Sequence, residues 1–169
     1  MGKSLQLLFS GANSLNAEQI DANISIGGYM SSSIVPKGLV NGIFPELSIY
    51  DLANFAPDTL AVFLKNNGTE DIPSISLLQV YDDNICRFEW AVVLPSEGGF
   101  IEMLGSKKET PYYAEFFEPD VATELLSATL EPGKSIGLWI RRTLIEVEDS
   151  CTYLELDSKK ENLEVTFNF

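Results

Sequence analysis

The chain has 169 residues, of which 45% are hydrophobic and 11% aromatic, enough for a single domain, residues 1–169, with a large core. Its 25 Asp and Glu residues outnumber its 11 Lys and Arg residues, and the net charge of −14 argues against a nucleic-acid partner, because phosphate binding needs clustered cations. No apolar run approaches the roughly 18 residues of a membrane helix, so we expect no membrane partner.

The first half of the chain predicts strands separated by turn residues. Apolar and polar residues alternate from Leu5 to Phe9, and a second extended segment runs from Tyr29 to Val35. Between them, Gly27 and Gly28 have the backbone freedom to make a sharp corner, a bulge or a close approach. The nearly continuous apolar run from Leu60 to Lys65 is typical of a strand that is buried on both faces.

Two extended runs in the middle of the chain predict a β-hairpin. They cover Ile75 to Tyr81 and Cys86 to Leu94, and the polar residues 82–84 form the turn between them. Side chains alternate between the faces of a strand, so one face of the second run should be buried and the other should point outward. The face expected to be buried carries Cys86, Phe88, Trp90 and Val92, and the outward face carries Arg87 and Glu89.

The last third of the chain adds shorter elements. Phe100 to Leu104 and Tyr112 to Phe117 are short strand candidates, whereas Pro119 to Leu126 has a helix-like start and room for two turns at most. The tripeptide Glu131-Pro132-Gly133 fits a type II turn. Alternation from Leu163 to Phe169 predicts a final, half-solvated strand.

These eight or nine strands, with no repeated helix between them, predict an all-β fold. Their spacing favours a β-sandwich, either jelly-roll or Ig-like, and a β-barrel is the alternative. The sequence shows no internal repeat, no heptad pattern and no low-complexity linker.

The residues that most enzymes need are missing from the sequence. Histidine is absent, which removes the commonest general base, the Ser-His and Cys-His nucleophile pairs and the usual zinc ligands. The sequence has no Walker loop, CxxC pair or G-x-S-x-G elbow either. Paired carboxylates could still hydrolyse a glycoside, but we expect a protein that is not an enzyme and uses no cofactor or metal. Cys86 and Cys151 are expected to be buried core residues.

The strongest predicted strand, Ser135 to Leu144, contains two of the three arginines of the chain side by side. Because successive side chains point to opposite faces, Arg142 shares a face with Ile140, and Arg141 shares the other face with Trp139. The arginine on the apolar face must therefore be paired, unless the strand leaves the core near Ile140.

We expect these two arginines to have different roles. Arg142 is predicted to form an internal ion pair with Glu146 or Glu148 across the sheet edge. Arg141, with Trp139 beside it as an aromatic anchor, is predicted to contact a neighbouring subunit, because acidic copies that pack together must offset like-charge repulsion. The alternatives are that both arginines are paired internally or that both are solvated.

Three stretches of the chain carry a family resemblance. They are ISIGGYMSSSIV, IFPELSIYDLANFAPDTLAVFLKNNGTED and LEPGKSIGLWIRRTL, and in this order they resemble small virion structural proteins of tailed bacteriophages. The most specific piece joins Leu130, Pro132 and Gly133 to the run Trp139 to Thr143. The chain departs from the pattern of that family between Phe44 and Thr59, where similar proteins are more acidic.

The resemblance implies a non-enzymatic virion protein. We expect a ring or adaptor component of the neck or tail, which assembles as a homo-oligomer in the host cytoplasm and binds copies of itself and other virion proteins (portal, tail or capsid). A capsid decoration protein is the alternative within this class. A carbohydrate-binding or adhesion module is the alternative of another class, and exposed aromatic residues around Tyr112, Tyr113, Phe116 and Phe117 would favour it.

Overall fold

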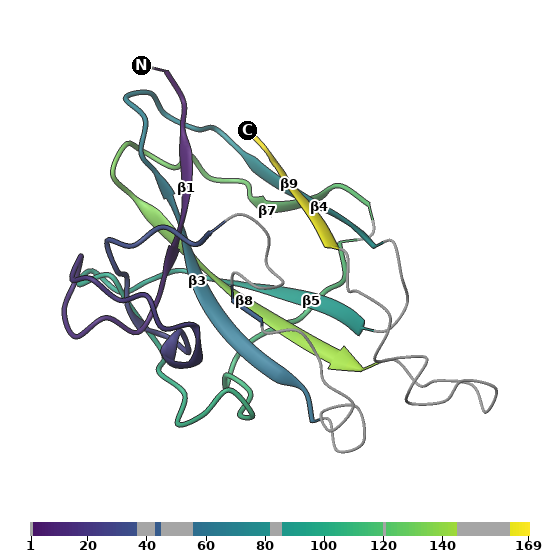
Figure 1. Ribbon diagram of the computed structural model, residues 1–169. Helices are drawn as coiled ribbons and strands as arrows, with labels where there is room; N and C mark the ends of the chain where they lie inside the picture. Colours follow the sequence, from purple (N-terminus) through teal and green to yellow (C-terminus); the bar gives the residue numbers. More distant parts are fainter. Residues whose placement is uncertain (1, 37–42, 45–55, 82–85, 120, 145–162) are drawn as a thin grey trace.

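The computed structural model shows an all-β protein whose antiparallel sheets pack together as a sandwich (Figure 1). The structure describes residues 2–36, 43–44, 56–81, 86–119, 121–144 and 163–169. Its elements are β1 (Leu5–Phe9), η1 (Ala22–Ile24), β2 (Gly28–Tyr29), β3 (Asp58–Asn66), β4 (Ile75–Tyr81), β5 (Cys86–Val93), β6 (Phe100–Ile101), β7 (Thr123–Leu126), β8 (Ser135–Leu144) and β9 (Leu163–Asn168). The predicted all-β sandwich is confirmed.

Two sheets and a short ribbon organise the described strands. The larger sheet has the strand order β1-β3-β8-β5, and the smaller sheet has the order β7-β4-β9. β2 pairs with β6 in a two-stranded ribbon. Because β1 and β5 lie at opposite ends of the larger sheet without pairing to each other, the described strands form an open sandwich and not the alternative barrel.

Strands β3 and β8 form the centre of the molecule. They pair antiparallel along eight positions, with Leu60 opposite Ile140 and Val62 opposite Leu138. Every residue of β3 except Lys65 is buried. The prediction of a strand buried on both faces is therefore confirmed, and any polar group on these two strands must find a partner inside the protein.

The predicted hairpin is wrong in its pairing. β4 pairs with β7 and β9, whereas β5 pairs with β8, so the two runs belong to different sheets. Each run shows the same alternation of apolar and polar residues whether the other run is its neighbour in one sheet or lies across the core in the second sheet. The sequence pattern could therefore not distinguish a hairpin from two strands in facing sheets.

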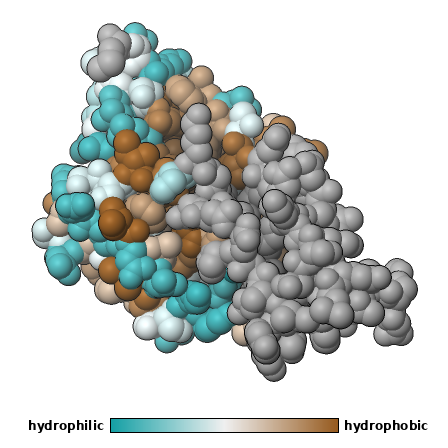
Figure 2. Space-filling model, viewed as in Figure 1, coloured by the Kyte–Doolittle hydropathy of each residue, from teal (hydrophilic) through white to brown (hydrophobic). Residues whose placement is uncertain are grey.

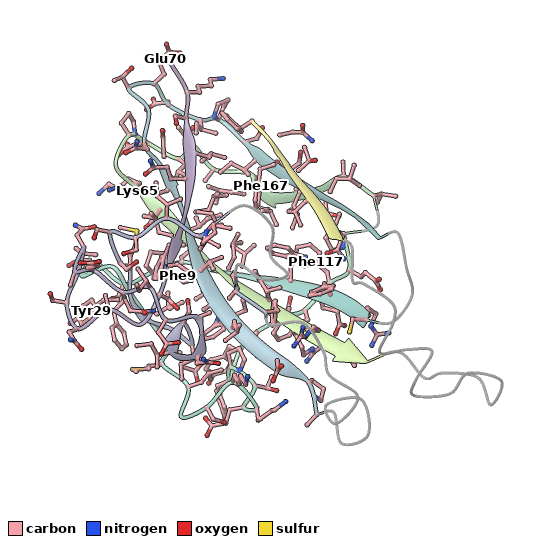
Figure 3. The ribbon with its side chains drawn as sticks, in the orientation of Figure 1. Phe9, Tyr29, Lys65, Glu70, Phe117 and Phe167 are labelled. Carbon is pink, nitrogen blue, oxygen red and sulfur yellow. The ribbon has the colours of Figure 1, made fainter. Side chains whose placement is uncertain are left out.

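β4 and β5 share no backbone pairing, and side chains connect them across the core. The buried Gln79 of β4 donates from Nε2 to the carbonyl oxygen of Phe88 and accepts from Trp90 Nε1, both at 2.7 Å. The Trp90 ring also meets Phe167 of β9 edge to face, with centroids 6.3 Å apart. Figure 3 shows Phe167 on β9 and Phe117 beside β5. The predicted buried face of β5 is confirmed at Cys86, Phe88 and Trp90, which are each at most 3% exposed, whereas Val92 is half-buried.

Two of the short elements differ from their predictions. The segment with the helix-like start contains β7, which pairs with β4, so the sheet overrides a weak local preference. Residues 112–117 form no strand, although the backbones of Phe117 and Trp90 exchange two hydrogen bonds of 2.8 Å.

The turn before β8 and the last strand agree with the sequence. Lys134 N–H donates to the carbonyl oxygen of Glu131 at 3.1 Å, and Gly133 has a φ of 79°, as a type II turn requires. The alternating segment at the end of the chain forms β9, which pairs with β4.

Loops from two regions of the chain cover the outer face of the larger sheet, opposite β4. Residues 10–35 are fixed to β3 by two buried hydroxyls, because Ser10 Oγ and Ser25 Oγ both donate to the carbonyl oxygen of Ala61, at 2.8 and 2.6 Å. The second region contributes Ile101, which packs where Gly137 of β8 leaves room. The outer face at this end of the sheet is therefore as dry as the inner one.

The predicted backbone corner lies where these two loop regions meet. Gly27 and Gly28 have φ values of 102° and 87°, which side chains disfavour. At Gly27 an added Cβ would also stand 1.8 Å from the carbonyl oxygen of Glu102. The glycine is thus needed both for its conformation and for a close approach of two backbones.

Comparing Gly27→Ala with Gly133→Ala should distinguish the cost of the positive φ from the cost of the backbone clash. Gly133 also has a positive φ, but an added Cβ there has no atom within 4 Å, so its cost should be about 1–2 kcal/mol. Gly27→Ala adds a backbone clash and should lower the free energy of unfolding by clearly more, measured by urea denaturation. Equal losses would show that the close approach is not rigid.

Truncation of Trp90 tests the contact between the sheets. Trp90 is fully buried and makes an indole hydrogen bond, so Trp90→Ala should cost about 3–5 kcal/mol in the free energy of unfolding. A loss below about 1 kcal/mol in chemical denaturation would place this side chain at the surface.

Candidate functional site: the charged end of the larger sheet

All three arginines of the chain lie at one end of the larger sheet, on the neighbouring strands β5 and β8. In the register of these strands Arg87 stands opposite Thr143, and Arg141 stands opposite Glu89. Arg142 stands between Phe88 of β5 and Asp58 of β3. Arg87 and Arg141 therefore share the outer face of the sheet, and Arg142 points to the inner face.

Arg142 remains on the apolar face and is paired there. Its side chain is 1% exposed, and Nη2 lies 3.3 Å from Oδ2 of Asp58, itself 4% exposed. The guanidinium carbon lies 5.0 Å from the centre of the Phe44 ring. Of the two alternatives that the sequence left for this arginine, pairing is the one that the structure adopts.

Among the described residues, the partner of Arg142 is Asp58, which reaches the arginine from the adjacent strand β3. Glu146 and Glu148, the partners that the sequence suggested, lie outside the described residues, so that pairing stays a prediction. The other carboxylate oxygen of Asp58 lies 2.6 Å from Nζ of Lys108. This buried carboxylate therefore joins two cations, one inside the core and one at the surface. Its position directly before the apolar run of β3 was the signal that could have identified it.

Arg141 is also engaged within its own subunit. Its Nη2 and Nε lie 2.9 and 3.0 Å from Oε2 of Glu89, the residue opposite it on β5. The guanidinium stacks 4.0 Å from the centre of the Phe116 ring. The side chains of Arg141 and Glu89 keep 26% and 15% of their surface exposed. A contact of Arg141 with a neighbouring subunit stays a prediction.

The expected interface role of Trp139 is corrected by its burial. The residue does share a face with Arg141, but it is only 2% exposed within the single chain. On the same face Ile101 packs against Gly137, two residues away from Trp139, and Trp139 belongs to the hydrophobic core, so the indole ring is a core side chain. Strand alternation predicted the correct face for Trp139, but it could not show that residues distant in the sequence bury this face.

An open pocket of about 310 Å³ lies on the outer face of the larger sheet, at its charged end. Its lining includes Arg87, Glu89, Lys108, Thr110, Arg141 and Thr143. Three cations thus meet in one place in a chain with a net charge of −14. The sequence could not predict this gathering, because Lys108 comes from a loop whose position depends on a backbone bond of 2.6 Å from Thr59 N–H to the carbonyl oxygen of Lys107.

The aromatic residues that would indicate a glycan site are divided between surface and core. Tyr112 and Tyr113 are 78% and 89% exposed, with their rings edge to face at a centroid distance of 4.5 Å. Phe116 and Phe117 are half-buried, and Phe116 lies against Arg141. The exposed tyrosine pair therefore stands alone, and its perpendicular rings do not form one flat platform.

Hydrophobic side chains are also exposed over the two loop regions, residues 10–35 and 99–104. Leu15, Ile20, Ile24 and Met103 are between 43% and 70% exposed. Figure 2 shows hydrophobic surface on the left of the view, where these loops lie. Tyr29, labelled in Figure 3 on the same side of the molecule, packs edge to face on Phe100 at 5.0 Å. Apolar residues gathered on a surface are typical of contact with other proteins.

Comparison of the chain with protein-family models, with curated proteins and with solved structures gave no match. Within the described ranges, no helix has the length and apolar character to cross a membrane, and no group of three or more Cys, Asp or Glu residues is placed to hold a metal ion. Cys86 is buried as expected, and Cys151 lies outside the described residues. The functional interpretation therefore depends on the geometry of the charged end and on the residues themselves.

Removing the carboxylate from the Arg142–Asp58 ion pair should destabilise the protein more than removing it from the Arg141–Glu89 ion pair. Asp58→Asn leaves the buried guanidinium of Arg142 without this counter-ion and should lower the free energy of unfolding by about 3–5 kcal/mol. Glu89→Gln removes the same charge from a partly solvated pair and should cost about 1 kcal/mol or less. Urea denaturation of both variants checks this difference, and similar losses would contradict the assignment of Asp58 as the buried partner.

Proposed function

We propose that the protein is a non-enzymatic structural component of a tailed-bacteriophage particle, a ring or adaptor subunit of the neck or tail that assembles as a homo-oligomer. The observation that carries the proposal is the segment Leu130 to Leu144, in which the family-like residues build the type II turn and the central strand β8. The resemblance therefore falls on residues that determine the fold, and a shared fold is what a shared assembly role would require.

The chemistry of the charged end supports a structural role. Glu89, the carboxylate that lines the pocket, is held by Arg141, and Asp58 is held by Arg142 and Lys108. A general base needs a carboxylate that is available to accept a proton, whereas these carboxylates neutralise cations. These ion pairs hold β3, β5 and β8 in position, and a subunit of an assembly needs a rigid surface of this kind.

The exposed apolar residues of the two loop regions also support assembly. Hydrophobic side chains that a single chain leaves in water are stabilised when another protein covers them. A capsid decoration protein would use the same properties, and location in the particle would separate it from a neck or tail subunit. In either case the protein would form part of the virion, after assembly in the host cytoplasm.

A carbohydrate-binding or adhesion module is the second candidate, because Tyr112 and Tyr113 are exposed and adjacent. Sugars pack on aromatic rings at protein surfaces, and this pair of tyrosines offers two exposed rings for such a contact. The half-buried positions of Phe116 and Phe117 limit the site to these two rings.

The two candidates differ in a solution experiment on the purified chain. A ring or adaptor subunit should form a species of defined mass in analytical ultracentrifugation and a ring in electron micrographs. A glycan-binding module should stay monomeric, and a glycan should raise its melting temperature in the wild type but not in Tyr112→Ala/Tyr113→Ala. A monomer at every protein concentration would contradict the assembly proposal.

A further inference from the structure

The cations of the pocket differ in whether the chain already neutralises them. Arg141 is held by Glu89, and Lys108 is held by Asp58 and also donates to the carbonyl oxygen of Ala56 at 2.7 Å. Arg87 is exposed and forms no ion pair with any residue that the structure describes. Its guanidinium is thus the cation of the pocket with capacity for an outside ligand.

We propose that this pocket binds a carboxylate group carried by a second copy of the chain, with Arg87 as the residue that receives it. The inference rests on the proposed function, since it specifies the contact through which copies assemble. Arg87 is the direct ligand of the carboxylate in this proposal, and Arg141, the arginine expected at the interface, lines the same pocket. A guanidinium binds a carboxylate through two parallel hydrogen bonds, and the hydroxyls of Thr110 and Thr143 line the same pocket as further donors.

The charge and size of the pocket match an amino-acid carboxylate. Glu89 offsets Arg141, and Asp58 is shared between Lys108 and the buried Arg142, so the pocket keeps net positive charge for an anionic ligand. The exposed guanidinium of Arg87 suits a carboxylate, whose two oxygens can accept two parallel hydrogen bonds from it. The volume of about 310 Å³ lies at the small end of the range for ligand pockets, which suits an acidic side chain with its methylene stem.

A second copy of the chain is the occupant that the overall charge favours. Each copy carries 25 acidic residues, so two copies repel unless cations lie where they meet. The pocket gathers three of the 11 Lys and Arg residues, so it attracts negative charge although the chain as a whole repels it. An acidic residue of one copy that enters the pocket of the next copy would therefore form an attractive contact between two chains that otherwise repel each other.

The contact limits the symmetry of the assembly. A cationic pocket cannot face an identical pocket, because the like charges would oppose each other, so it must meet an acidic residue at another position on the next copy. If that acidic residue lies beside the pocket, the contact is reciprocal and makes a two-fold dimer; if it lies elsewhere, the contact is head-to-tail and closes into rings or continues as filaments. The ring of the proposed function requires the head-to-tail form.

The test compares two charge reversals on the full chain. Arg87→Glu places a carboxylate in the pocket, and Lys134→Glu makes the same charge change at an exposed residue in the turn before the other end of β8. Sedimentation velocity should show that wild type and Lys134→Glu assemble alike, whereas the midpoint concentration for Arg87→Glu rises by about tenfold or more. Assembly of the wild type should weaken towards about 1 M salt, where the screening length falls to about 3 Å. Circular dichroism and thermal melting verify that both variants are folded.

A mixing experiment tests the head-to-tail geometry. An Arg87→Glu chain keeps the acidic residues of the wild type, so one of them can fill the pocket of a wild-type chain, but its own pocket cannot receive the next chain. Small amounts of this variant should therefore stop the growth of wild-type assemblies and leave rings incomplete in electron micrographs, whereas Lys134→Glu should join them without effect.

Each outcome decides between the proposals. If the wild type assembles and Arg87→Glu assembles as well as Lys134→Glu, the pocket contact is wrong while the proposed assembly function stands. If the wild type is monomeric at all concentrations and salt levels, the assembly function fails, and the second copy as occupant fails with it. If both variants lose assembly equally, total charge and not the pocket controls association, and the pocket contact is again wrong.

Discussion

The burial of β3 and β8 on both faces is the constraint on which the rest of this structure depends. The inner faces of these strands belong to the hydrophobic core, and the outer face of β8 packs against Ile101 at Gly137, before it opens at the pocket that Arg141 and Thr143 line. Where no water reaches either face, every polar group needs a partner from the protein itself. The described contacts supply these partners: Asp58 for Arg142, and the hydroxyls of Ser10 and Ser25 for the Ala61 carbonyl oxygen.

The same constraint divides the arginines of the chain into three environments. The inward position of Arg142 makes its ion pair a condition of folding, since an uncompensated buried charge would cost several kcal/mol. Arg141 lies at the boundary of the covered region, where Glu89 and Phe116 hold it in place and solvent weakens the pair. Arg87 lies one step further out, on an exposed position of the edge strand β5. The role in stability of Arg142, the role in local order of Arg141 and the binding role that we propose for Arg87 thus follow the distance of each cation from the dry centre.

Sequence patterns predicted those features that depend on neighbouring residues. Alternation placed Trp90 on a buried face, the unbroken apolar run identified β3 as a central strand, and Pro132 with Gly133 located the turn before β8. Alternation also put Arg141 and Arg142 on opposite faces of one strand, which the structure confirms.

Features that depend on contacts between distant residues were not accessible in this way. The partner strands of β4 could not be derived, because its alternation of residues is the same whether it pairs with β5 or with β7 and β9. The burial of Trp139 requires loops from two distant parts of the chain. The charged pocket combines β5, β8 and the loop that carries Lys108, and no local pattern relates these segments.

The two tryptophans of the chain lie on opposite faces of the larger sheet, Trp90 towards β4 and Trp139 under the loops. Each indole ring therefore reports on a different internal boundary of the protein, one between the two sheets and the other between a sheet and its loop cover. If the loops detach while the sandwich stays intact, the emission of Trp139 shifts to the red as water reaches it, and that of Trp90 does not. The fluorescence of single-tryptophan variants can thus resolve whether the molecule loses its structure in one step or from its outer layer inward.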